Sequence, residues 1–136
     1  MPFVVDASIV ACWAFRDEEH PHADLALNRL RRDDAVVPSL WWYEVRNILV
    51  VNERRRRLTE ADTAAFLRHL NRLGIDVDPS PREADVLRLA RVHGLSVYDA
   101  TYLELAQRNG IALASLDGAL VRAARAEAIA VVGVDA

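Results

Sequence analysis

Short apolar runs alternate along this chain with longer stretches in which apolar residues recur at helical spacing. The runs are nearly continuous, as is typical of strands that are buried on both faces of a sheet. Five of them lie at residues 3–5, 35–37, 75–77, 111–115 and 130–132. Parallel strands need crossover connections, so strands separated by helices predict an α/β fold with a parallel sheet covered on both faces.

The stretches between the runs predict helices whose starts carry capping residues. Thr59 and Asp62, three residues apart, predict a capping box. Ser39 is expected to cap the third helix, and Ser80 to open the fifth with Pro81 in its first turn. The expected helices cover residues 8–15, 21–32, 40–51, 60–73, 81–93, 97–108 and 118–126.

Length and composition predict one globular domain. The chain has 136 residues, of which 52% are hydrophobic and 27% charged. Its apolar segments are too short to span a bilayer, and the first residues lack a basic leader, so a soluble cytoplasmic protein is expected, with no membrane contact. The single cysteine, Cys12, excludes an internal disulfide and a cysteine-based zinc site.

The distribution of charge is more informative than the net charge of -3, which by itself argues against a nucleic-acid partner. All 17 basic residues are arginine. The missing lysine excludes Schiff-base chemistry and a Walker phosphate loop. Four arginines form a run that either contacts RNA phosphates or is a solvated helix end: Arg54, Arg55, Arg56 and Arg57.

Four acidic residues stand at notable places in the predicted fold. Asp6 directly follows the first predicted strand, and Asp117 follows the fourth. Glu44 and Asp99 fall early in predicted helices. In a parallel sheet, binding sites form beyond the carboxyl ends of the strands, where the strand order reverses. These acids are therefore candidates for one site.

Each acid also has a purely structural interpretation. Asp6 and Asp117 could cap the helices that follow them, and Asp99 could complete a capping box with Ser96. Glu44 lies past the first turn of its helix, so capping does not explain it, and its structural alternative is a partly exposed glutamate at the edge of the apolar stripe. Its neighbours three and four positions away offer no cation: Leu40, Trp41, Asn47 and Ile48.

Taken together, the four acids predict a divalent-metal site. Converging carboxylates would repel one another and stay partly protonated unless a cation joined them. Mg²⁺ or Mn²⁺ takes oxygen ligands and keeps several waters, which leaves room for a phosphodiester and a metal-activated water. No catalytic histidine is needed. The histidines lack metal-ligand spacing and are expected at the surface: His20, His22, His69 and His93.

Four segments, in this order and at this spacing, resemble the motifs of the PIN-domain ribonucleases. VVDASI contains Asp6, WYEVRNIL contains Glu44 and Asn47, VYDATYLELA contains Asp99, and ASLD ends at Asp117. The length and helix pattern are most similar to the VapC-type toxins of toxin-antitoxin pairs. The resemblance spans the chain, so residues 1–136 are expected to form a single PIN domain.

The resemblance implies a three-layer α/β/α fold with the strand order 3-2-1-4-5. It also implies that the protein is an endoribonuclease that cuts RNA. Its catalytic acids, which bind Mg²⁺ or Mn²⁺, would be Asp6, Glu44, Asp99 and Asp117. Such enzymes commonly form homodimers. A VapB-type antitoxin inhibits them by covering the acidic pocket with its tail.

Polar residues near the acids are candidates for supporting roles. Ser115 stands two residues before Asp117, where the family often has threonine, and its hydroxyl can hydrogen-bond to the carboxylates. Ser8 and Asn47 are candidates for similar roles. Their structural alternatives are a serine at a helix start and a polar residue at the edge of a stripe.

The resemblance also implies a hydrophobic groove among the early helices that binds the antitoxin. Two apolar segments, residues 8–15 and 41–51, could line it, because they hold more apolar surface than one face of a small sheet needs. Trp41 and Trp42 are adjacent and cannot both point into one core. Trp13 and Trp42 are the candidate groove residues, and core packing stays open for Trp13.

Two other function classes remain open from the sequence. A noncatalytic PIN-like scaffold could retain all four acids without cutting RNA. A receiver-type phosphoacceptor domain also places acids around magnesium at strand ends, but the missing lysine counts against it.

Overall fold

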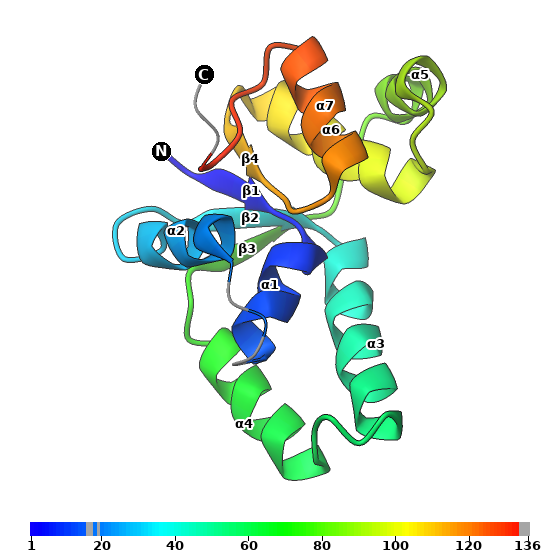
Figure 1. The fold of residues 1–136 in the computed structure, drawn as a ribbon. Coiled ribbons are helices and arrows are strands. Elements are labelled where there is room, and N and C mark those ends of the chain that lie inside the picture. The colour runs from blue at the N-terminus through cyan, green and yellow to red at the C-terminus, as the bar shows by residue number, and fades with distance from the viewer. Residues whose placement is uncertain (16–17, 19, 134–136) are drawn as a thin grey trace.

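A four-stranded parallel sheet forms the centre of the protein (Figure 1). The computed structural model describes residues 1–15, 18 and 20–133. The strand order is β3-β2-β1-β4. The strands are β1 (Phe3–Val5), β2 (Ala35–Pro38), β3 (Ile75–Asp78) and β4 (Ala112–Ala114). The predicted parallel sheet and the predicted order of these four strands are confirmed.

The fifth predicted strand is wrong as a full strand. Residues 130–132 contribute only an isolated parallel bridge between Leu113 and Val131. The Leu113 amide donates to the Ala130 carbonyl, and the Val132 amide donates to the Leu113 carbonyl, both at 2.9 Å. This segment lies at the sheet edge with its side chains partly exposed, so it buries too little apolar surface to extend the pairing.

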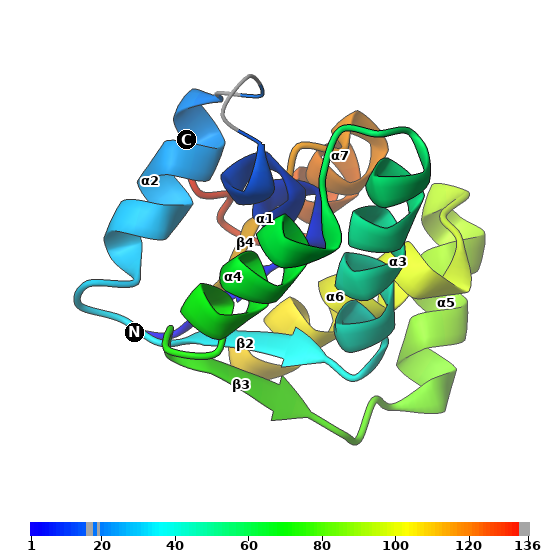
Figure 2. The same ribbon diagram turned by 90° about the horizontal axis from the view of Figure 1, so that it is seen from below.

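Helices cover both faces of the sheet, as the α/β prediction required. Figures 1 and 2 show α5, α6 and α7 on one side and α1, α2 and α4 on the other, with α3 running on from the end of β2. None of the described helices is long and apolar enough to cross a membrane. The helices are α1 (Ala7–Ala14), α2 (Pro21–Arg29), α3 (Leu40–Arg54), α4 (Glu60–Leu70), α5 (Glu83–His93), α6 (Val97–Asn109) and α7 (Gly118–Ala126).

The helix starts follow the sequence prediction in one case and depart from it in two. Thr59 and Asp62 form the predicted capping box. Ser39 has a helical backbone and makes no capping hydrogen bond, so its prediction is wrong. Ser80 does not open α5 either, because the helix begins later with Arg82 as its N-cap. The backbone amide of Arg82 donates instead to the buried Glu104 carboxylate, at 3.2 Å.

Two helices end earlier than their apolar stripes predicted, α2 at Arg29 and α4 at Leu70. In each case the chain continues with tighter bonds from residue i+3 to residue i, such as Arg32 to Arg29 and Leu73 to Leu70. Such turns are common at helix ends and keep the side chains on nearly the same face.

The core fixes the two elements that matter most for the site. All three residues of β1 are fully buried, and α6 is buried from Ala100 to Ala106. Helix α6 packs against β1, β2 and β4. Asp6 therefore follows a rigid strand, and Asp99 sits in the first turn of a helix that is held by the sheet.

Candidate acidic site

The carboxyl ends of β1 and β4 lie side by side. Val5 pairs with Ala114, and the Asp6 amide donates to the Ala114 carbonyl at 3.1 Å. This pairing brings Asp6, at the end of the first strand, next to Ser115 at the end of the fourth. The prediction that these two strand ends meet is confirmed.

Asp6 is a buried carboxylate surrounded by neutral donors. It is 6% exposed. The Ser8 hydroxyl donates to Asp6 Oδ1 at 2.6 Å, and the Ile9 amide donates to the same oxygen at 3.2 Å. The Ser115 hydroxyl donates to Asp6 Oδ2. Burial raises the pKa of Asp6 despite these bonds, and the charge of Asp99 raises it further.

The two serines also hold the loop that follows β4. Ser8 Oγ accepts from the Leu116 amide, and Ser115 Oγ accepts from the Asp117 amide, both at 3.0 Å. Asp117 in turn caps α7 by accepting from the Leu120 amide at 3.1 Å. The predicted contacts of Ser8 and Ser115 with a carboxylate are present, and both serines join that carboxylate to the backbone.

Glu44 lies in α3 and reaches across to α6. It is half-buried, and the Tyr102 hydroxyl donates to Glu44 Oε1 at 2.6 Å. Burial raises the pKa of Glu44, and the charges of Asp6 and Asp99 add to the effect. Glu44 is thus partly exposed, as its structural alternative expected, but it also makes a specific contact with α6, and its role in a metal site stays a prediction.

Asp99 stands in the first turn of α6, where its amide donates to Ser96 Oγ at 3.0 Å. This is one half of a capping box, and the return bond from the Ser96 amide is not formed in this helix. Burial raises the pKa of Asp99, and the charge of Asp117 raises it further. The four acids thus act on one another electrostatically. The charge of Asp117 raises the pKa of Asp99, and the charge of Asp99 raises the pKa values of Asp6 and Glu44.

We call Asp6, Glu44, Asp99 and Asp117 the acidic site. None of the ion pairs formed among residues 1–15, 18 and 20–133 involves any of them. Within the same ranges, no three Asp, Glu, His or Cys side chains are gathered tightly enough to enclose a metal ion. Mg²⁺ keeps several waters and takes only one or two carboxylates directly, so an open set of hard oxygen donors fits this ion.

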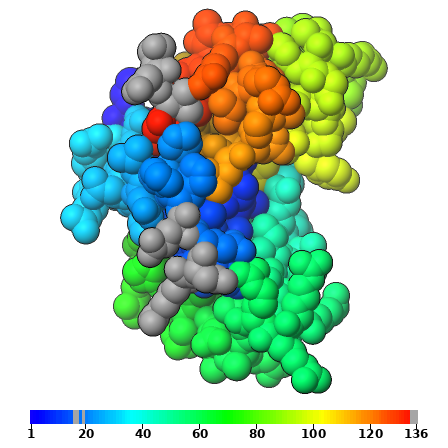
Figure 3. All heavy atoms as spheres, in the orientation of Figure 1, coloured from blue at the N-terminus to red at the C-terminus, as the bar shows by residue number. Residues whose placement is uncertain are grey.

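The surface near the acids lies between two groups of helices. Figure 3 shows blue atoms of α1 reaching the surface between orange α7 and the blue-green α3. A separate hollow of about 510 Å³ lies at the opposite end of the sheet, beside Met1, Ile111 and Ala112. That hollow includes none of the four acids.

Asn47 and the arginine run make no hydrogen bond or ion pair with the four acids among the described residues. Asn47 is exposed on α3, and its supporting role stays a prediction. Arg54 ends α3, about 15 Å along the helix axis from Glu44 at 1.5 Å per residue. Arg57 has a structural role, since it binds Asn52 and stacks on the Phe15 ring. RNA contact by the arginine run stays a prediction.

The adjacent Trp41 and Trp42 differ in burial, as predicted. Trp41 is buried, whereas Trp42 is 49% exposed and carries the Arg46 guanidinium stacked on its ring. Trp13 packs against the core, and its Nε1 donates to the Ala23 carbonyl at 2.9 Å. Neither apolar segment is sealed in the core, so the antitoxin groove stays a prediction.

One histidine prediction is wrong, and the sequence did not reveal one contact at the acidic site or one buried carboxylate elsewhere. His93 is mostly buried and pairs with Glu127 at 2.8 Å, because α5 and the end of α7 close over it. The contact of Tyr102 with Glu44 was missed, although Tyr102 stands one turn after Asp99 on the same helix. Glu104 was missed as a buried carboxylate.

A parallel α/β sheet with acids after two neighbouring strands, here β1 and β4, defines a class of open-sheet proteins that bind ligands at this edge. Within that class, the chain belongs to the PIN-domain family, which residues 3–126 match. It is 32% identical over 120 residues to ribonuclease VapC3 of Pyrobaculum aerophilum, covering 86% of this chain and 90% of that protein. The resemblance to VapC-type PIN proteins is confirmed, and the receiver-type interpretation is excluded.

Solved structures show the same fold. PAE2754 from Pyrobaculum aerophilum superimposes with a TM-score of 0.69 at 27% identity, covering 90% of this chain and 87% of that one. VapC20 of Mycobacterium tuberculosis, described as a sarcin-ricin loop cleaving toxin, has a TM-score of 0.60 at 15% identity. That comparison covers 89% of this chain and 94% of VapC20.

Proposed function

We propose that this PIN-domain protein is a divalent-metal-dependent endoribonuclease and the toxin of a toxin-antitoxin pair. Its similarity to ribonuclease VapC3 supports the nuclease class. The observation that carries the proposal is that the fold buries these acids without giving them a positively charged partner. Burial and mutual repulsion raise the pKa values of Asp6, Glu44 and Asp99, and no arginine is paired with them in the described part of the chain.

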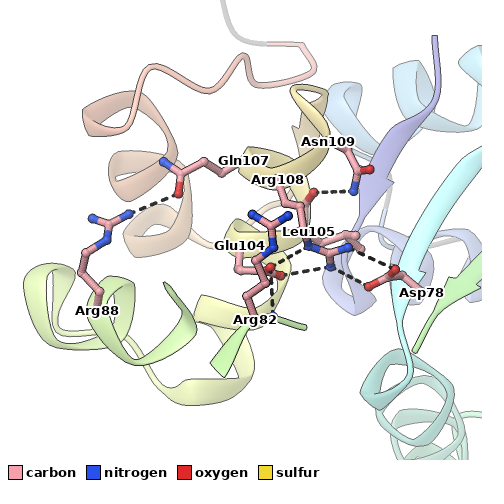
Figure 4. A network of polar contacts seen from close by, with 8 residues as sticks. All are labelled: Asp78, Arg82, Arg88, Glu104, Leu105, Gln107, Arg108 and Asn109. Carbon is pink, nitrogen blue, oxygen red and sulfur yellow. Dashed lines mark hydrogen bonds and ion pairs between the residues drawn. The ribbon is translucent and has the colours of Figure 1, made fainter. Parts of the chain in front are cut away.

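Partly buried acids elsewhere receive a cation. Figure 4 shows Glu104 and Asp78 both bound by Arg108, at 2.7 Å and 2.6 Å. These contacts lower the pKa of Asp78. The His93 side chain similarly lowers the pKa of Glu127. The chain thus compensates its structural carboxylates and leaves the acidic site with unbalanced negative charge, which favours binding of an external cation.

In the proposed mechanism, the acids of this site would hold Mg²⁺ or Mn²⁺, and the bound ion would supply an activated water and charge stabilisation at phosphorus. Ser8 and Ser115 orient Asp6 through their hydroxyls, and Tyr102 orients Glu44. Asp117 is held at the start of α7 by the Leu120 amide. These contacts set carboxylate directions without neutralising their charge.

Partners follow from the same proposal. We assign RNA as substrate, a VapB-type antitoxin as inhibitor, a homodimer as the working form and the cytoplasm as its location. Trp42 supports the antitoxin assignment, because a half-exposed tryptophan beside an apolar helix face suits a partner helix. Light scattering of the free protein should give the dimer mass, and a monomer at micromolar concentration would contradict this part.

A noncatalytic PIN-like scaffold is the second candidate function. It is favoured by the absence of a tight three-acid cluster within the described ranges. A scaffold would bind its partner protein equally well in EDTA and with Asp6 neutralised.

The decisive experiment uses circular and linear RNA with the purified protein in Mg²⁺ or Mn²⁺. Circular RNA has no ends, so its cleavage requires an endonuclease. Asp6→Asn and Asp99→Asn should abolish cutting, as should EDTA, while the exposed strand residue Asp76→Asn should leave it intact. Cleavage that persists in EDTA and in both site variants would indicate a contaminating nuclease. Failure of the wild type on all RNAs, with partner binding retained, would favour the scaffold.

A further inference from the structure

Tyr102 is a buried tyrosine whose hydroxyl reaches the acidic site. The residue is 1% exposed and lies in α6, one turn after Asp99. Its hydroxyl donates to Glu44 Oε1 at 2.6 Å and also bonds to the backbone of Ala7. This one group therefore connects α3, which carries Glu44, to the residue that follows Asp6.

Glu44 needs such a contact more than Asp6 does. Its side chain has three rotatable bonds, and the nearby charges of Asp6 and Asp99 act to push it away from the site. Asp6 is held by three donors, whereas the Tyr102 hydroxyl is the one hydrogen-bond partner that Glu44 has in the described part of the chain. Without this bond, the rotamers that point to water would be favoured.

Glu44 is the one side chain that the hydroxyl bonds to among the described residues. A phenylalanine would fill the same buried volume, and burial of a phenol hydroxyl is costly unless a partner is found. Burial and the Glu44 carboxylate together raise the pKa of Tyr102 above its usual range, so it stays a neutral donor. A neutral donor orients a carboxylate and leaves its negative charge available.

We infer that Tyr102 is a positioning residue that holds Glu44 toward Asp6 and Asp99 before a divalent cation binds. The inference rests on the proposed function, because it assigns Glu44 to the cation. One carboxylate oxygen is engaged by the tyrosine, and the second makes no hydrogen bond to the described residues. The cation then meets a preorganised ligand, so less conformational entropy is lost on binding.

The test compares Tyr102→Phe with Tyr98→Phe. Tyr98 is a matched control, because it lies on the same helix next to Asp99 but is 65% exposed. Binding of Mn²⁺ to the RNA-free protein is measured by calorimetry, and the melting temperature is measured in EDTA. We expect Tyr102→Phe to weaken Mn²⁺ binding about 10- to 100-fold, the range found when partners of metal ligands are removed. Tyr98→Phe should bind Mn²⁺ as the wild type does.

The outcomes separate the inference from the proposed function. If wild type and Tyr102→Phe bind Mn²⁺ equally and both cut RNA, the inference is wrong and the function stands. A lower melting temperature in EDTA with unchanged Mn²⁺ affinity assigns Tyr102 a packing role and also overturns the inference. A wild type that neither binds Mn²⁺ nor cuts RNA overturns both.

Discussion

Neutralising Asp99 separates the metal interpretation from the capping interpretation. Asp99→Asn keeps an oxygen acceptor and leaves the bond from the residue 99 amide to Ser96 Oγ in place. It removes one negative charge from a site in which burial and the charge of Asp117 already raise the pKa of Asp99. The metal-free variant should therefore be as stable as the wild type or slightly more stable. A capping carboxylate would instead cost about 1 kcal/mol on removal.

The size of the stabilisation by bound metal follows from the linkage between metal binding and folding. A ligand at 100 times its Kd stabilises the folded state by about 2.7 kcal/mol. Unfolding entropy of about 2.1 cal/mol/K per residue gives this 136-residue chain a Tm shift of about 3.5 °C per kcal/mol. Wild type should thus gain about 9 °C at that Mn²⁺ concentration. If Asp99→Asn binds about 100-fold more weakly, the same concentration stabilises it by only about 0.4 kcal/mol, or about 1.5 °C.

The assay is a thermal melt of wild type, Asp99→Asn and Asp76→Asn across a Mn²⁺ series and in EDTA. Asp76 is exposed on β3 and controls for the loss of a surface charge. Equal Mn²⁺ shifts in all three proteins would refute the assignment of Asp99 to the cation. A loss of about 1 kcal/mol or more in EDTA for Asp99→Asn alone would show that its carboxylate serves the helix.

Three further predictions concern stability. Ser115→Ala should destabilise the metal-free fold by about 1–3 kcal/mol in urea unfolding, because the buried Asp6 carboxylate loses a donor. Ser115→Thr keeps the hydroxyl and should be close to neutral. Equal losses of stability in the two variants would contradict this. In EDTA, the free energy of unfolding should fall as pH rises from about 4 toward neutrality. The pKa values of Asp6, Glu44 and Asp99 are higher in the folded than in the unfolded state, so the folded protein binds more protons and loses this stabilisation as they leave. A free energy of unfolding that rises over this pH range would contradict these shifts. Glu104→Ala should cost about 1–3 kcal/mol, because the Arg82 amide loses its acceptor while Arg108 keeps Asp78; the absence of a measurable loss would contradict this.

The sheet and two of the acids could be predicted because their signals are local. A continuous apolar run such as residues 3–5 fits a buried strand, and an acid directly after it must lie at the sheet edge. Asp6 and Asp117 therefore followed from position alone. The segment at residues 130–132 has the same apolar character, but it pairs through only two hydrogen bonds, and pairing length depends on buried area that the pattern does not reveal.

Contacts between distant helices could not be predicted in the same way. A tyrosine in a buried helix has the same periodicity whether its hydroxyl is bonded or not, so Tyr102 was not distinguishable from a core aromatic. Glu104 and Arg108, four residues apart, are typical of a pair on a solvated helix face. In the fold, the chain before α5 and Asp78 of β3 contact this pair, so Glu104 is buried and Arg108 is partly buried.

Capping and metal binding are compatible at Asp6 and Asp117 because they make different demands on a carboxylate. A helix start supplies amide hydrogens and a partial positive charge, which fix direction and lower the cost of burying an anion. It does not provide the full counter-charge that Arg108 gives Glu104. Each carboxylate oxygen can accept more than one partner, so the Ile9 and Leu120 amides leave acceptor capacity unused. Helix starts, serine hydroxyls and a tyrosine hydroxyl thus keep these carboxylates directed while their charge remains for a cation.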